Sequence, residues 1–252
     1  MVTKPLEGRV ALITGASRGL GRAMAVALAQ GGAKLALVAR DEDKLKETAA
    51  DVVSAGSEAR IFIADVAREA DVEGLKHDVA HAYGHIDILI NNAGINHRKN
   101  LVDFTLDEWQ RVMNTNVTSV FLMCRAFIPM MQGRGYGRII NMTSIMAHVS
   151  LPGRTVYSTT KTALLGLTRA LAQELAADGI TVVGISPGPF GTEMNIPIMQ
   201  NPDINAQFIS KIPLGRWGKV EEIGQLALFL CSDGAGFITG TDILIDGGWC
   251  AQ

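Results

Sequence analysis

The chain alternates short apolar runs rich in valine and isoleucine with longer segments that have the period of a helix. Near-continuous apolar runs are typical of parallel strands, because such strands are buried on both faces of their sheet. Right-handed crossover connections then place the intervening helices on both faces. The alternation therefore predicts an α/β fold, a doubly wound and Rossmann-like parallel sheet between two layers of helices.

The predicted elements fill one sheet. Seven strands are expected, at residues 10–14, 35–40, 60–65, 86–91, 138–142, 181–186 and 242–245. Helices are expected at residues 23–30, 41–54, 70–83, 106–131 and 156–177. Residues 1–252 are therefore predicted to form a single domain. The proline-containing stretch 188–219 interrupts the alternation, and we interpret it as an insertion that covers the substrate site.

Composition argues against several classes of partner. The 23 lysine and arginine residues balance 25 aspartate and glutamate residues, giving a net charge of -2, so neither nucleic acid nor an anionic membrane is expected. The three cysteines form no C-x-x-C pair, which predicts reduced thiols and no metal site. We find no apolar leader and no run long enough to span a membrane. A cytoplasmic protein with a small-molecule ligand is the expectation.

A glycine-rich turn follows the first predicted strand, with the spacing G-x-x-x-G-x-G and a helix expected to begin near Gly19. Glycines let the backbone turn tightly and approach a pyrophosphate, whose charge the helix N-terminus favours. The spacing differs from the general G-x-G-x-x-G fingerprint, and the same glycines also fit an ordinary strand-to-helix turn. The candidate cofactor-binding residues of this turn are Gly15, Ser17, Arg18, Gly19, Leu20 and Gly21.

Arg40 ends the second predicted strand, where the adenosine ribose of a dinucleotide is expected. A guanidinium suits a 2′-phosphate, so Arg40 favours NADP(H) over NAD(H). Asp41 is well placed to cap the next helix, or alternatively to accept a hydrogen bond from a free ribose hydroxyl. Asp65, with Val66 beside it, ends the third strand and suits either an adenine edge or a helix cap.

The fourth predicted strand ends in Asn91-Asn92-Ala93-Gly94. The small residues of this segment permit close approach of a ligand to the backbone, so Asn92 and Gly94 are candidate cofactor contacts. Asparagine and glycine at a strand end also make ordinary turns.

Tyr157 and Lys161 are four residues apart in a predicted helix and therefore share one face. A free tyrosine has a pKa of about 10, and a neighbouring ammonium would lower that pKa toward the range of a useful general acid or base. Ser144 follows the fifth strand at the edge of the sheet where such folds bind ligands. A tyrosine–lysine pair alone also fits any exposed helix.

The ordered set of motifs resembles the short-chain dehydrogenase/reductase family over nearly the whole chain. The matching elements are Thr14-Gly15-x-x-x-Gly19-x-Gly21, Asn91-Asn92-Ala93-Gly94, Asn116, Ser144, Tyr157-x-x-x-Lys161 and Pro187-Gly188-x-x-x-Thr192. The resemblance implies that Ser144 orients the substrate oxygen and Tyr157 exchanges the proton. It implies that Lys161 binds the nicotinamide ribose and tunes Tyr157.

The same resemblance implies further contacts. Asn116, rather than the rival Asn114, would hold a water that links Lys161 to solvent. The loop that contacts the nicotinamide carboxamide would contain Pro187, Gly188, Phe190 and Thr192. A homotetramer is also implied, and the apolar residues around the predicted helices 106–131 and 156–177 fit such an assembly.

The expected function is an NADP(H)-dependent oxidoreductase that reduces a carbonyl or oxidises a secondary alcohol. The segments 94–98, 192–195 and 213–218 look most similar to the gluconate 5-dehydrogenase branch, which acts on sugar acids, so the expected substrate is a sugar acid or polyol. The alternative is a 3-oxoacyl-acyl-carrier-protein reductase. His97, Arg98 and Arg154 could form a basic mouth for a carboxylate or be solvated charges. A dinucleotide-sensing protein without catalysis is the non-enzymatic alternative, which the complete set of Asn116, Ser144, Tyr157 and Lys161 disfavours.

Overall fold

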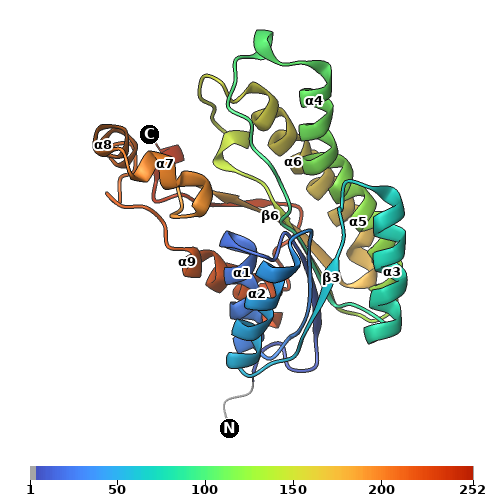
Figure 1. The fold of residues 1–252 in the computed structure, drawn as a ribbon. Coiled ribbons are helices and arrows are strands. Elements are labelled where there is room, and N and C mark those ends of the chain that lie inside the picture. The colour runs from blue at the N-terminus through green and yellow to red at the C-terminus, as the bar shows by residue number, and fades with distance from the viewer. Residues whose placement is uncertain (1–3, 252) are drawn as a thin grey trace.

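One parallel sheet organises the computed structural model, which describes residues 4–251 (Figure 1). Its strand order is β3-β2-β1-β4-β5-β6-β7, and every neighbouring pair is parallel. The strands are β1 (Val10–Thr14), β2 (Lys34–Ala39), β3 (Ala59–Ile63), β4 (Ile88–Asn91), β5 (Gly137–Met142), β6 (Ile180–Pro187) and β7 (Asp242–Ile245). The predicted fold class is confirmed. Residues 1–3 and 252 of the expected domain 1–252 lie outside the described residues.

The strand order reverses between β1 and β4. The chain builds outward from β1 through β2 to β3, and then returns to place β4 on the other side of β1. Helices that follow β1 and β4 therefore diverge to opposite faces of the sheet, and a crevice opens above the carboxyl ends of these two strands. Ligands of open α/β sheets bind at such a switch point.

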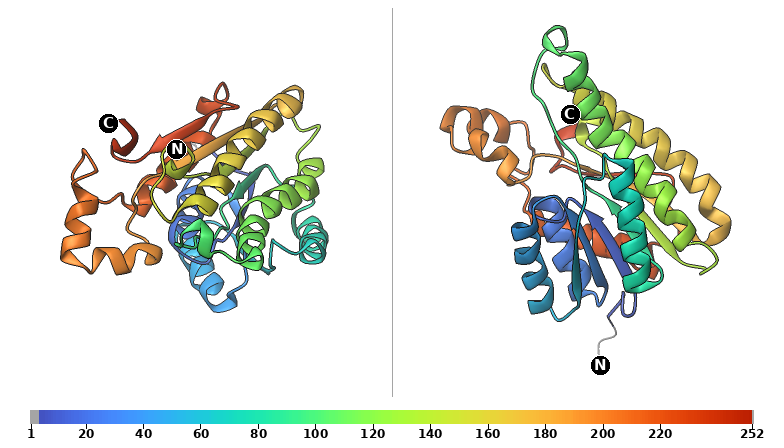
Figure 2. Two further views of the ribbon diagram at one scale, coloured as in Figure 1. Left: turned by 90° about the horizontal axis from the view of Figure 1, so that it is seen from above. Right: turned by 45° about the vertical axis from the view of Figure 1, so that its right-hand side comes forward.

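Helices cover both faces of the sheet (Figures 1 and 2). On one face lie α1 (Gly19–Gln30), α2 (Glu42–Ser54) and α9 (Val220–Cys231), and on the other α3 (Glu69–Tyr83), α4 (Leu106–Met113), α5 (Ser119–Phe127) and α6 (Thr155–Leu175). Side chains that alternate along β1 feed the two cores, since Leu12 packs in one buried cluster and Ile13 in the other. No helix between residues 4 and 251 combines the length and apolar character needed to span a membrane.

The predicted helix 106–131 is not one regular helix, and this part of the prediction is wrong. After α4, a five-residue π-helical segment, η2 (Asn114–Thr118), precedes α5, and a 3-10 turn, η3 (Ile128–Met130), follows α5. Asn116 lies inside the π segment with its side chain buried and hydrogen-bonded. Single-turn π segments are frequent at functional sites. The prediction rested on the helix-forming residues along 106–131, and such a composition does not distinguish α-helical from π-helical hydrogen bonding.

The stretch 188–219 forms its own small layer beside the carboxyl edge of the sheet (Figures 1 and 2). It contains η6 (Glu193–Asn195), α7 (Ile196–Met199) and α8 (Pro202–Ile209). Phe208 of α8 stacks on Trp217 with ring centroids 5.8 Å apart and packs against Trp249 at 5.7 Å. These aromatic contacts fix the layer over the edge where the crevice opens.

A chain of buried side-chain amides and hydroxyls ties α6 to the sheet. The Asn91 Nδ2 on β4 donates to the Asn141 Oδ1 on β5 at 2.9 Å, and the Asn141 Nδ2 donates to the Thr168 Oγ1 on α6 at 2.9 Å. Asn141 and Thr168 are almost completely buried. Because α6 also carries Tyr157 and Lys161, these hydrogen bonds fix the position of both residues relative to the ends of the strands.

Replacing Thr168 with valine should destabilise the protein by about 1 to 3 kcal/mol, because the buried Asn141 amide loses its acceptor while the shape of the side chain is kept. Urea unfolding measures the difference. Thr159→Val on the same helix is the matched control, since Thr159 is exposed and its hydroxyl bonds only within the helix, to the Thr155 carbonyl. Equal losses in the two variants would contradict the prediction.

Candidate active site

A cavity of about 980 Å³ opens above the carboxyl edge of the sheet, at the crevice between β1 and β4. It runs from the glycine-rich turn to the start of α6, under the layer formed by 188–219. Its lining contains these predicted residues: Gly15, Ser17, Arg18, Gly19, Leu20, Arg40, Asp65, Val66, Asn92, Gly94, Ser144, Tyr157, Lys161, Pro187, Gly188, Phe190 and Thr192. The other two predicted cofactor-binding and catalytic residues, Gly21 and Asn116, lie outside this lining, as does His97 of the expected basic mouth.

The glycine-rich turn is locked to the end of β4. The Asn92 Nδ2 donates to the carbonyls of Thr14 and Gly15, each at 3.0 Å, and the Thr14 Oγ1 accepts from the backbone N–H of Asn92. Gly15 has a φ of +63°, in the left-handed region that favours glycine. A Cβ on Gly21 would lie 2.3 Å from the Gly15 carbonyl oxygen, so Gly21 acts by letting α1 pack against the turn. The result is a cradle of bare backbone that fits a dinucleotide phosphate.

Two residues expected near the adenosine have partners within the chain. The Arg40 guanidinium is exposed and lies 3.5 Å from the Asp65 carboxylate. Asp41 caps α2, because its Oδ1 accepts from the Lys44 backbone N–H at 3.2 Å. The capping alternative for Asp41 is therefore confirmed, and Arg40 is left at the mouth of the cavity.

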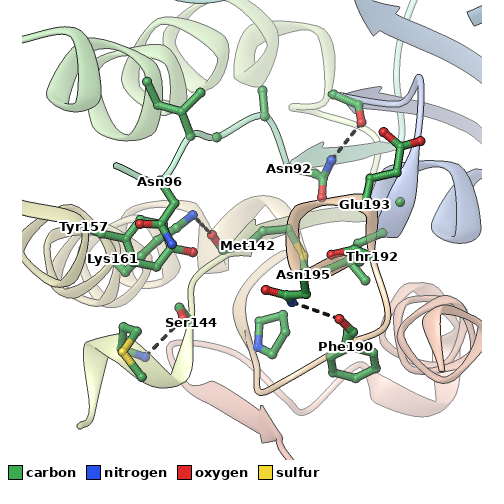
Figure 3. A pocket seen from close by; sticks show the side chains of 18 of the residues that line it. Asn92, Asn96, Met142, Ser144, Tyr157, Lys161, Phe190, Thr192, Glu193 and Asn195 are labelled. Carbon is green, nitrogen blue, oxygen red and sulfur yellow. Dashed lines mark hydrogen bonds between the residues drawn. The ribbon is translucent and has the colours of Figure 1, made fainter. Parts of the chain in front are cut away.

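Glu193, which sequence reasoning did not assign to the site, occupies the phosphate end. Its Oε2 lies 3.0 Å from the Arg18 Nη1 and 3.7 Å from the Lys44 Nζ. Figure 3 shows Glu193 next to Thr192. Arg18 and Glu193 are 175 positions apart in the chain, and no local pattern links them. The carboxylate joins the insertion to the glycine-rich turn.

Ser144, Tyr157 and Lys161 meet at the other end of the cavity (Figure 3). Ser144 follows β5 and caps the 3-10 turn η4 (Ile145–Ala147), where its Oγ accepts from the Met146 N–H at 3.1 Å. Lys161 is buried, and its Nζ donates to the Met142 carbonyl at 2.6 Å and lies 5.7 Å from the centroid of the Tyr157 ring. A hydroxyl, a phenol and an ammonium thus share one wall.

Burial controls the protonation of this wall. Burial raises the pKa of Tyr157, and the hydrogen bond with Ser144 and the charge of Arg154 only partly oppose it. Burial also lowers the pKa of Lys161 to about 8. The expectation that Lys161 lowers the pKa of Tyr157 is therefore wrong for this arrangement, because the ammonium is directed at the Met142 carbonyl and desolvation outweighs the nearby charges.

Asn116 braces the loop that follows β4. Its Nδ2 donates to the Ile95 carbonyl at 2.9 Å and to the Thr160 Oγ1 at 3.0 Å, while its Oδ1 accepts from the Ile95 N–H at 2.8 Å. A Cβ on Gly94 would lie 3.3 Å from the Asn116 Oδ1 and 3.6 Å from the Lys161 Nζ. Asn116 thus holds this loop against α6 through Thr160, a residue that sequence reasoning missed. Its role in binding a water stays a prediction.

The loop after β6 forms the floor between the two ends. Pro187 ends β6, Phe190 is buried, and the Asn195 Nδ2 donates to the Phe190 carbonyl at 2.9 Å (Figure 3). A Cβ on Gly188 would lie 2.7 Å from the Asp246 Cα, which explains the glycine. Phe208, Trp217 and Trp249 form an aromatic wall of the cavity. Sequence reasoning missed Phe208 and Trp249, because nothing in the sequence except their aromatic side chains links them to the site.

Comparison with known proteins decides the family. The family model described as enoyl-(acyl carrier protein) reductase matches residues 15–250. A short-chain type dehydrogenase/reductase from Mycobacterium marinum superposes with a TM-score of 0.92 and 39% identity, covering 98% of this chain and 97% of that one. The chain belongs to the short-chain dehydrogenase/reductase family. It is accordingly an oxidoreductase that acts on a CH–OH group with NAD(P) as acceptor.

Relatives within the short-chain dehydrogenase/reductase family differ in substrate. The chain is 43% identical to the acetoacetyl-CoA reductase of Shinella zoogloeoides, over 95% of this chain and 98% of that protein. It is 36% identical to the gluconate 5-dehydrogenase of Gluconobacter oxydans, over 96% and 95%. It is also 36% identical to the 3-oxoacyl-acyl-carrier-protein reductase of Haemophilus influenzae, over 96% and 98%. Resemblance to the gluconate branch is therefore one of several equally close similarities.

Two of the solved relatives carry NADP in their names. The RhlG/NADP active-site complex of Pseudomonas aeruginosa superposes with a TM-score of 0.93 and 33% identity, covering 99% of each chain. The cradle of this chain fits the same class of group. Gly15 and Gly21 leave no side chain in the turn, and Arg18 and Arg40 lie on the cavity lining with cationic groups that suit phosphate.

Lys161→Met should change how stability depends on pH. The folded pKa of Lys161, about 8, lies below its ordinary value of 10.5, so the unfolded chain binds more protons between these two pH values. The free energy of unfolding of the parent, relative to Lys161→Met, should therefore rise by about 3 kcal/mol as pH increases through this window. Below pH 8 the difference should stay constant. Urea unfolding of both proteins from pH 7 to 10.5 measures it, and a flat difference throughout would contradict the prediction.

Proposed function

We propose that this protein is an NADP(H)-dependent oxidoreductase that interconverts a ketone and a secondary alcohol in a sugar acid or polyol. The observation that carries the reaction is the wall formed by Ser144, Tyr157 and Lys161, at the opposite end of one cavity from the glycine-rich cradle. A long cofactor that lies in the cradle can extend along the floor loop to that wall. The reacting carbon of the substrate would then lie between the cofactor and Tyr157.

The residues of the wall divide the proton chemistry between them. The bound nicotinamide supplies or accepts the hydride. Tyr157, whose pKa is raised by burial, stays protonated at neutral pH and can donate its proton to a carbonyl oxygen in the reducing direction. Ser144 lies on the same wall and can donate to that oxygen, orienting it. Lys161 lies next to Gly94, where its ammonium can hold ribose hydroxyls.

Substrate class is the finer part of the proposal. Similarity to gluconate 5-dehydrogenase supports a sugar acid. The aromatic wall of Phe208, Trp217 and Trp249 instead favours the acyl chain of an oxoacyl thioester, in line with the similarity to the two acyl reductases. The two substrate classes can be distinguished by measuring turnover of keto sugar acids, simple ketones and oxoacyl thioesters with NADPH. Turnover confined to the thioesters would overturn the sugar-acid assignment.

Tyr157→Phe tests whether the protein is an enzyme of this kind or a sensor of the dinucleotide. We expect turnover to fall by about two or more orders of magnitude, because the general acid is lost, while NADPH binding measured by fluorescence persists. Tyr83→Phe is the matched control, since the Tyr83 hydroxyl bonds to the Leu35 carbonyl away from the cavity. Near-normal turnover in Tyr157→Phe would remove Tyr157 from the reaction.

Arg40 is proposed as the main reason for a preference for NADP(H). A charge-assisted contact with a phosphate contributes about 1.5 to 3 kcal/mol, so Arg40→Ala should lower kcat/KM for NADPH by roughly tenfold to a hundredfold and leave NADH nearly unchanged. Arg68→Ala, which removes an exposed arginine outside the cavity lining, is the control. An unaltered ratio of the two cofactors, or a parent that prefers NADH, would contradict the assignment.

A homotetramer is proposed for the assembly. The surface keeps large apolar side chains that a partner subunit could cover: Phe237 is fully exposed and Val102 and Leu106 are 91% and 69% exposed. Light scattering at micromolar concentration should give about four times the chain mass of 26.9 kDa. Phe237→Glu should shift the population toward smaller species. A monomeric mass for the parent would reject the tetramer.

A further inference from the structure

Two polar atoms on the cavity lining are buried and have no hydrogen-bond partner among the described residues. They are the Nη1 of Arg154 and the Oδ1 of Asn96. Arg154 immediately precedes α6, three positions before Tyr157, and Asn96 lies in the loop after β4. Figure 3 shows the Asn96 amide reaching from that loop toward the wall of Tyr157 and Lys161. A donor and an acceptor are therefore left unpaired beside the reacting position.

Leaving a buried guanidinium nitrogen without an acceptor is costly, because its desolvation is not offset by a hydrogen bond. Burial lowers the pKa of Arg154, and the nearby charge of Arg98 lowers it further. Arg98 itself is exposed on the same lining and bonds only to the neutral Asn195 Oδ1, at 3.3 Å. Neither arginine has an ion-pair partner among residues 4–251. Two cations thus face one end of the cavity without an opposing charge.

The carboxylates that line the cavity belong to its other end. Glu193 is held by Arg18 and Lys44, and Asp65 lies against Arg40. His97, the third residue of the expected basic mouth, is directed elsewhere, since its Nε2 lies 3.0 Å from the Arg111 Nη2 and its ring lies near Phe104. The positive charge at the substrate end therefore comes from Arg98 and Arg154, in addition to the Lys161 ammonium that donates to the Met142 carbonyl.

We propose that Arg154, assisted by Arg98, binds a carboxylate of the substrate, and that Asn96 accepts a hydrogen bond from a hydroxyl of the same molecule. This inference rests on the proposed oxidoreductase function and names its substrate class as a small hydroxy acid or oxo acid. Because Arg154 lies three positions before Tyr157 on the same cavity lining, the carboxylate would lie on the same side of the cavity as the reacting carbon. A thioester lacks a free carboxylate at that position.

Calorimetric binding tests the site without depending on turnover. The probes are gluconate and 3-hydroxybutyrate, each paired with a neutral counterpart, sorbitol and 2-butanol. They are titrated into protein saturated with NADPH, because an alcohol cannot transfer a hydride to the reduced cofactor. We expect at least one acid to bind tenfold or more tightly than its counterpart. Arg154→Met should abolish that preference, with a loss of roughly tenfold to a hundredfold in affinity for the acid. Arg154→Lys should recover part of it, because the charge is kept.

Arg111→Met is the matched control, since Arg111 is exposed and lies outside the cavity lining. The proposal is overturned if both acids bind no better than their neutral counterparts, or if the preference survives in Arg154→Met. The affinities of the acid and the neutral probe are compared in the parent protein, so this part of the test does not depend on whether a variant folds. NADPH-dependent reduction of a neutral ketone is measured separately. If no ketone is reduced, the proposed reaction is contradicted. The carboxylate site is tested only by the difference in affinity between each acid and its neutral counterpart.

Discussion

The hydrogen bonds between Asn92 and the glycine-rich turn are the constraint on which the site depends. They join the carboxyl ends of β1 and β4, the two strands between which the sheet order reverses. One side of this junction leads into α1 and the other into the loop that Asn116 braces. Because no side chain fits at Gly21 between these groups, the cradle and the catalytic loop are fixed relative to each other. A cofactor that binds the cradle is thereby aligned with the wall of Tyr157.

Burial shifts the pKa values of three ionisable groups at the start of α6 away from their ordinary values. Burial raises the pKa of Tyr157, lowers the pKa of Lys161 and lowers the pKa of Arg154. All three shifts disfavour the charged form, so this end of the cavity disfavours ionised groups that lack partners. A substrate or cofactor that supplies hydroxyls and a negative charge would relieve this cost. Strongly perturbed groups in one cleft are typical of catalytic sites.

Much of the fold could be predicted from the sequence because its strands and helix ends are determined by residues that are neighbours in the chain. The apolar runs indicated the strands, and the cap at Asp41 and the helix start at Gly19 follow from neighbouring residues. The features that sequence reasoning missed or misjudged depend on contacts across the fold. Glu193 meets Arg18 only through the tertiary structure, and the pKa of Tyr157 depends on burial, which Tyr157-x-x-x-Lys161 does not encode.

The π segment between α4 and α5 puts the two helices out of phase by one residue. In a regular helix each residue turns the chain by about 100°, so the buried face of α5 is aligned with that of α4 only because the extra residue is present. Removing one residue from 114–118 would restore regular winding and rotate α5 about its axis by that amount. The buried side chains of Met123 and Phe127 would then swing away from the core. This short stretch is therefore a poor place for length variation, although its ends lie in ordinary helix.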